Sequence, residues 1–146
     1  MSAMSNYLEN TLIDFIFRGQ PFTPSSNMYV GLFTSTPSDI GGGTEVISGS
    51  YTRATIISSL LNWAGTQAVA STDISSGTNG TTSNNGVITF PVPSADWGVV
   101  RGFGIFDSYT NGNLLFWGNL TIPKTVNNGD SAPTFPINSL TIQLDN

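Results

Sequence analysis

The segment GFGIFDSYTNGNLLFWGNL, residues 102–120, has the pattern of a β-hairpin. Asn111-Gly112 is a strong signal for a two-residue type I′ turn, because both central positions of that turn need a positive φ. A turn at this point pairs Thr110 with Asn113 and so decides which side chains share a face of the hairpin. The segment therefore predicts an antiparallel sheet built around this hairpin.

The predicted register gives the hairpin two unequal faces. The first face is large and apolar and is expected to be core: Phe103 opposite Leu120, Ile105 opposite Gly118, and Tyr109 opposite Leu114. The second face is small and polar apart from one aromatic pair: Phe106 opposite Trp117, beside Gly102, Gly104, Asn119 and Thr121. An aromatic pair ringed by small residues is typical of an interface hot spot. Coverage of this face by an N-terminal helix is the open alternative.

The rest of the chain predicts one helix followed by strands. Asn6 and Glu9 have capping-box spacing, and Gly19 is the expected stop of a helix over about residues 6–17. Its apolar stripe is expected to dock on the sheet: Leu8, Leu12, Phe15 and Ile16. Strands are expected from about residue 27 onward, with 27–35 central and buried. Residues 71–86 are expected to form a polar loop that projects and contacts a neighbouring protein, or else is the least ordered part of the chain. Leu140, Ile142 and Leu144 are expected to point inward from the last strand.

These patterns predict a single domain over residues 1–146. Many short strands at turn-marked spacing indicate an all-β fold, an antiparallel β-sandwich or jelly roll with one short N-terminal α-helix. Neither an internal repeat nor a linker that would divide the chain is evident in the sequence.

Composition argues against several classes of function. The chain has a formal net charge of -5 and only four Lys plus Arg, so a basic footprint for nucleic acid cannot be assembled. Without Cys or His, zinc sites and His-based catalysis are not expected. No run approaches a membrane span, and the first ten residues lack the order of a signal peptide. The prediction is a protein without enzymatic activity, cofactor, metal, nucleic-acid or membrane partner.

A few side chains stand out as candidates for contacts. Arg53 and Arg101 lie in charge-poor strands, and each is expected to need a carboxylate partner from Glu45, Asp96 or Asp107, unless Arg101 reaches another protein. The three Trp are expected to be core residues or interface anchors. The candidate interface residues are Phe106, Trp117, Gly102, Gly104, Arg101, Trp63 and Trp97.

Several segments together carry a resemblance to known proteins. These segments are MYVGLFTSTP, GGGTEVISGSYTRATI, NWAGTQ, TTSNNGVITFPVPSADWG, FGIFD and LLFWGNLTIPKTVNNGD. In their order and in their residues, they resemble a family of small bacteriophage virion proteins. Its members are labelled tail-fibre-like, or capsid cement or decoration proteins. The resemblance covers nearly the whole chain, brings no catalytic residues with it, and implies a structural part of a virus particle.

From this resemblance, the leading hypothesis is a capsid cement protein on the particle exterior, assembled in the host cytoplasm. It would bind the major capsid protein in many copies and self-associate as a dimer or trimer. A tail-associated or tail-fibre structural protein is the alternative, and a carbohydrate-binding module is the second alternative.

Overall fold

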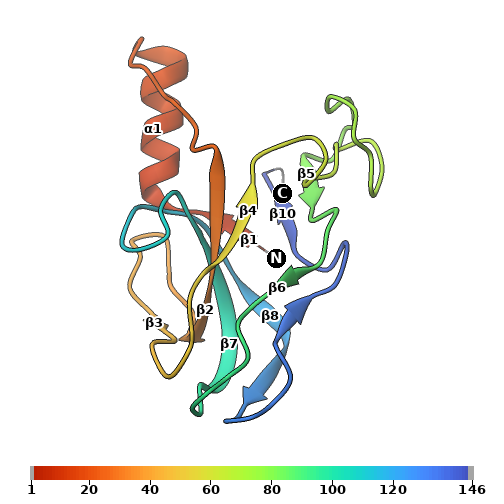
Figure 1. Ribbon diagram of the computed structural model, residues 1–146. Helices are drawn as coiled ribbons and strands as arrows, with labels where there is room; N and C mark the ends of the chain where they lie inside the picture. The colour runs from red at the N-terminus through yellow and green to blue at the C-terminus, as the bar shows by residue number, and fades with distance from the viewer. Residues whose placement is uncertain (1, 145–146) are drawn as a thin grey trace.

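The computed structural model describes residues 2–144 and shows the predicted all-β architecture with one N-terminal helix (Figure 1). The elements in chain order are β1 Ser2–Met4, α1 Asn6–Phe17, β2 Asn27–Ser35, β3 Thr44–Glu45, β4 Ala54–Ile57, β5 Thr81–Ser83, β6 Ile88–Thr89, β7 Gly98–Phe106, β8 Leu114–Val126, β9 Thr134–Phe135 and β10 Thr141–Gln143. Within the described residues, no helix has the length and apolar character to cross a membrane.

The main sheet has six strands, all paired antiparallel. Strands β1, β8, β7, β2 and β3 are hydrogen-bonded in that order, and β4 pairs with the other half of the same edge of β2. Strand β2 is central, as predicted, because it buries apolar side chains on both faces: Val30 and Leu32 on one, Phe33 on the other. The hairpin of β7 and β8 supplies the longest ladder.

Two small sheets pack on the first face of the main sheet and close the core. One consists of β5 and β10, the other of β6 and β9. Ile88 of β6, Ile142 of β10 and Leu140, which directly precedes β10, join Phe103 and Ile105 of β7 in one buried cluster. The layer opposite the main sheet is therefore built from two short strand pairs and connecting segments.

The register predicted for the β7–β8 hairpin is wrong. Phe106 lies opposite Leu114, and Trp117 lies opposite Gly104. Asn111 and Gly112 do adopt positive φ values, 55° and 75°, but the strands end before them and leave a loop over residues 107–113. The register differs because side chains hydrogen-bond to the backbone of this loop: Arg53 to the carbonyls of Ser108 and Asn111, and Asp107 to the amide of Asn113.

Helix α1 has the predicted bounds, but most of the predicted docking stripe is not buried. Leu8 is buried and Leu12 half-buried, whereas Phe15 is 50% and Ile16 62% exposed. The helix contacts β8 through its first turns and then extends beyond the sheet, so its second half has no strand beneath it (Figure 1). The N-cap is Ser5, not Asn6, and Gly19 ends the helix with a φ of 66°.

Three local features also differ from what the sequence indicated. Strand β1 was not predicted, since three residues carry no periodic signal. The polar segment 71–86 is not loop throughout, because β5 lies within it and Asn84 is buried, its side chain bonded to the backbone of Gly86, Pro136 and Leu140. Leu144 is 57% exposed, although Leu140 and Ile142 are buried as predicted.

Ser5 joins the start of α1 to β8, and its removal is expected to destabilise the protein. Its hydroxyl accepts a hydrogen bond from the Leu8 amide at 3.3 Å and donates one to the Leu114 carbonyl. We expect Ser5→Ala to lower the free energy of unfolding by about 1–2 kcal/mol in urea titrations, because the cap is lost and a buried carbonyl is left unpaired. The control Thr11→Ala, on the same helix, should change it by less than about 0.5 kcal/mol. Equal effects of the two changes would contradict a specific role for Ser5.

Candidate functional site

The second face of the main sheet is covered by the segment that connects β2 to β4. This face carries Tyr29, Gly31 and Phe33 of β2, Gly102, Gly104 and Phe106 of β7, and Trp117 and Asn119 of β8. Part of this segment, β3, pairs at the edge of the sheet, and other side chains of residues 36–53 reach the second face at three points: Thr36 at Asn119, Asp39 at Trp117, and Arg53 at Phe106. The covering element is thus neither α1 nor a partner, but the chain's own connection.

Small residues on this face make the close approach possible. A Cβ at Gly31 would lie 2.7 Å from the Glu45 carboxylate, and one at Gly102 would collide with the Thr36 hydroxyl. Thr36 in turn donates a hydrogen bond to the side-chain oxygen of Asn119 at 2.7 Å. Gly102, which the sequence analysis identified, and Gly31, which it did not, therefore make room for Thr36 and Glu45 of the same chain.

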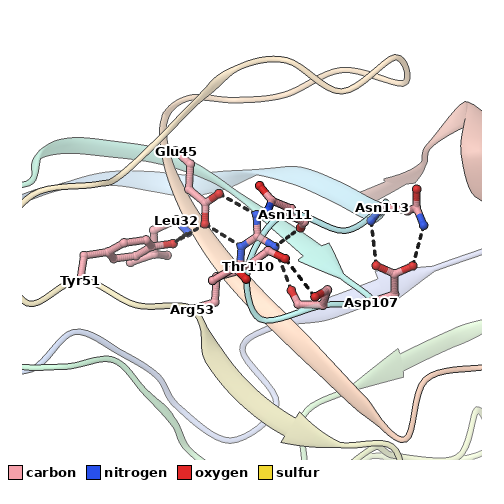
Figure 2. Close-up of polar contacts among 9 residues, drawn as sticks. Leu32, Glu45, Tyr51, Arg53, Asp107, Thr110, Asn111 and Asn113 are labelled. Atoms are coloured by element: carbon pink, nitrogen blue, oxygen red, sulfur yellow. Dashed lines mark hydrogen bonds and ion pairs between the residues drawn. The ribbon is translucent and has the colours of Figure 1, made fainter.

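Arg53 is the centre of the polar contacts on this face (Figure 2). Its Nε and one terminal nitrogen donate to the two oxygens of Glu45, both at 2.8 Å. Its other terminal nitrogen donates to the carbonyls of Ser108 at 2.9 Å and Asn111 at 2.7 Å. The side chain thus binds a carboxylate from the covering segment and two carbonyls from the β7–β8 loop. We call this group, Glu45, Arg53, Ser108 and Asn111, the arginine clasp.

Stacking and burial strengthen the arginine clasp. The guanidinium carbon of Arg53 lies 3.4 Å from the centroid of the Phe106 ring, which itself stacks on Phe33 at 6.2 Å. Only 7% of the Arg53 side chain and 22% of that of Glu45 are exposed. A flat guanidinium can satisfy several acceptors and an aromatic face at the same time, which a lysine cannot do.

Tyr51 extends the arginine clasp toward the core. Its hydroxyl donates to a Glu45 oxygen at 2.9 Å and accepts from the Leu32 amide at 2.9 Å. Its ring packs edge-on against Trp97 at 5.3 Å. Burial raises the pKa of Tyr51 far above its usual value of about 10, and the adjacent carboxylate of Glu45 acts in the same direction, while the Leu32 amide opposes them.

A second carboxylate holds the β7–β8 loop. Asp107 accepts hydrogen bonds from the backbone amide of Asn113 at 2.7 Å and from its side-chain amide at 2.8 Å. The Asn113 amide is therefore not free to continue the strand ladder, which ends at the pair of Phe106 and Leu114. Together with the arginine clasp, this contact explains the register that the Asn-Gly signal alone did not predict.

The predicted interface residues do not form one exposed patch. Gly102, Gly104 and Phe106 are buried beneath the covering segment. Trp117 is half-buried at its rim, where its ring nitrogen donates to Asp39 at 3.1 Å. Neither Thr36 nor Asp39 was singled out from the sequence, since no local pattern marks a loop residue that will cross a sheet.

The other three predicted residues lie apart from this group. Trp97 is 4% exposed and belongs to the main core. Trp63 is half-buried in a turn and forms an isolated bridge with Asn84. Arg101 is exposed at a bulge where residues 120–123 of β8 oppose it, and no carboxylate of residues 2–144 pairs with it. Of the two arginines, only Arg53 has a partner from the predicted set, namely Glu45.

A groove runs between α1 and the segment that returns to β2. Tyr7, Phe22 and Met28 contribute its apolar part, and Asp14 and Asp107 its acids. Asp14 is bonded to Arg18 and Asp107 to Asn113, and none of the Trp residues lines the groove. Among the described residues, no cluster of three or more acidic side chains offers a metal site.

The chain matches the model of a known protein family. A family model described as "Podophage GP4 fiber I protein gp80" matches residues 3–143, which include every strand and the helix except Ser2 of β1. None of the curated proteins matches the chain.

We expect loss of Arg53 to be far more costly than loss of an exposed arginine. Arg53→Met keeps most of the volume but removes the charged partner of Glu45, which keeps only the Tyr51 hydroxyl, and the shared donor of two carbonyls; this should lower the free energy of unfolding by about 3–5 kcal/mol in urea. Arg18→Met is the matched control, because it also removes an arginine from an ion pair of 2.7 Å, but one whose side chains are 70% and 40% exposed. That change should cost less than about 1 kcal/mol. Similar losses for both variants would show that the arginine clasp contributes little.

Stability should fall at alkaline pH because of Tyr51. Its folded-state pKa is raised, so above about pH 10 the unfolded chain releases this proton while the folded chain retains it, and the free energy of unfolding falls by about 1.4 kcal/mol per pH unit for one proton. Below about pH 10 the contribution is fully present. In Tyr51→Phe, chemical denaturation between about pH 9 and 11.5 should show a slope smaller by up to one proton. An unchanged slope in this variant would exclude Tyr51 as the cause.

Proposed function

The chain belongs to the family of the podophage GP4 fiber I protein gp80, and we propose that it serves as a structural component of a phage tail fibre. Membership makes it a bacteriophage structural protein and a component of the virion. The observation that carries the proposal is the extent of the match: residues 3–143 include both layers of the sheet structure and α1, so the whole domain is the family's domain.

The structure supports a mechanical role for this domain. The second face of the main sheet is closed by a buried ion pair, four hydrogen bonds to one guanidinium and stacked aromatic rings. Such contacts hold a long connection rigidly against a sheet. The resulting unit suits a protein that bears load or presents a surface within an assembly, and its structural role needs no reaction chemistry at the arginine clasp.

The proposal favours the tail over the capsid shell. The sequence resemblance alone left capsid cement as the leading hypothesis, whereas the family description names a fibre. An exterior position agrees with the formal net charge of -5, because an acidic surface is repelled by packaged DNA. A carbohydrate-binding role has less support, since the groove beside α1 is not lined by Trp and its two acids are engaged within the chain.

Location in purified particles tests the proposal. Antibodies against the chain, used for immunogold electron microscopy of intact virions, should label the tail, and quantitative mass spectrometry should find far fewer copies than of the major capsid protein. Under this proposal the copies are confined to the tail. Labelling spread over the shell, with hundreds of copies per particle, would instead support capsid cement and overturn the tail assignment.

A further inference from the structure

Helix α1 presents an apolar face that the chain itself leaves open. Ile13 is 51%, Ile16 62% and Phe17 80% exposed, and Leu12 is half-buried. We call these four residues the helix-tip face. They lie on the part of α1 that extends beyond the main sheet (Figure 1). Exposing this much apolar surface on one short helix is unfavourable unless something covers it.

The four residues form one continuous stripe along the helix. Leu12 and Ile16 are four positions apart, as are Ile13 and Phe17, so each pair forms a row whose members differ by only about 40° around the axis. The two rows are neighbours, about 100° apart. Phe15 lies outside this stripe and packs edge-on against Phe22 at 6.3 Å, although it remains 50% exposed.

Three other strongly exposed apolar side chains do not form such a stripe. Ile40, Ile47 and Ile122 are 86%, 90% and 79% exposed, but they lie in two loop positions and on one strand. Scattered apolar residues are normal on protein surfaces. The helix-tip face differs because its members are adjacent on one rigid element.

Charge indicates what kind of partner the helix-tip face suits. Asp14 and Arg18, the charged residues of this half of the helix, bond to each other at 2.7 Å on the opposite side of α1. Glu9 lies on the same side of α1 but one turn before Leu12, so the four residues of the helix-tip face themselves carry no charge that would select a basic or acidic partner. The chain has a formal net charge of -5, so two copies repel unless they meet through a surface without acids. The helix-tip face is such a surface.

We propose that the helix-tip face is covered by the same helix of another copy of this chain. A contact between two such faces buries apolar rows against each other without desolvating a charge. It is also self-complementary, as a symmetric homo-oligomer requires. This inference does not depend on where in the virion the protein sits.

The available area predicts how strong this association is. Four side chains that are each about half exposed offer roughly 100 Å² apiece, or about half of the 800 Å² per partner in a typical stable interface. The contact between helices is therefore expected to be weak and concentration-dependent in solution. In an assembly that holds many copies close together, a weak contact is sufficient.

Sedimentation equilibrium on the full chain, from about 1 µM to about 1 mM, tests the proposal, since this range spans weak complexes. The wild type should change from the 15.4 kDa monomer to a multiple of that mass as concentration rises. Ile16→Glu should raise the midpoint of this change about tenfold or more, because a charge would be buried at the contact. Circular dichroism should show that the variant is folded, since Ile16 is exposed in the single chain.

Ile122→Glu is the matched control, with the same substitution at an exposed Ile on β8. It should leave the midpoint within about twofold of the wild type. A wild type that stays monomeric throughout would overturn the proposal. So would an oligomer that Ile16→Glu leaves intact, or one that both variants weaken equally, since the contact would then lie elsewhere or depend only on charge.

Discussion

The buried guanidinium of Arg53 is the constraint on which the second face of the main sheet depends. It is bonded to Glu45 on one side and to the β7–β8 loop on the other, and its plane rests on Phe106. Two segments far apart in sequence are thereby held to one side chain. A buried cation is costly unless its donors are satisfied, and here four hydrogen bonds and an aromatic ring satisfy them.

This arrangement also explains why glycines recur on the covered face. The guanidinium lies on the Phe106 ring, but the Glu45 carboxylate and the Thr36 hydroxyl approach the strands at positions where a Cβ would collide with them. Gly31 accommodates Glu45, and Gly102 accommodates Thr36. The sequence signal that resembles an interface hot spot thus has an intramolecular source, an aromatic ring beside glycines that receives an arginine from the same chain.

The sequence predicts elements better than it predicts their partners. Strand β2 and helix α1 have the expected bounds because periodicity and caps act over a few neighbouring residues. The pairing of Arg53 with Glu45 was among three options, since charges are so scarce here. The predicted register of β7 against β8 was wrong because Asp107 and Arg53 form hydrogen bonds with the backbone of the loop between them. The exposure of Phe15 and Ile16 was also not predicted. Periodicity locates the apolar face of a helix, but it does not show how far the sheet beneath the helix extends.

The two ends of the described chain lie side by side, which bears on how the domain can be rewired. The Gln143 amide donates to the Ser2 hydroxyl at 3.0 Å, and β1 lies against β10 (Figure 1). A short linker could therefore join the ends, and new termini could be opened in the exposed turn around Ala70, where φ is 61° and the backbone faces solvent. Such a circular permutant would keep every strand pairing, and its termini would lie in the connection between β4 and β5. Because Ser2 and Gln143 are in contact, the same fold can be formed by a chain whose segments are connected in a different order.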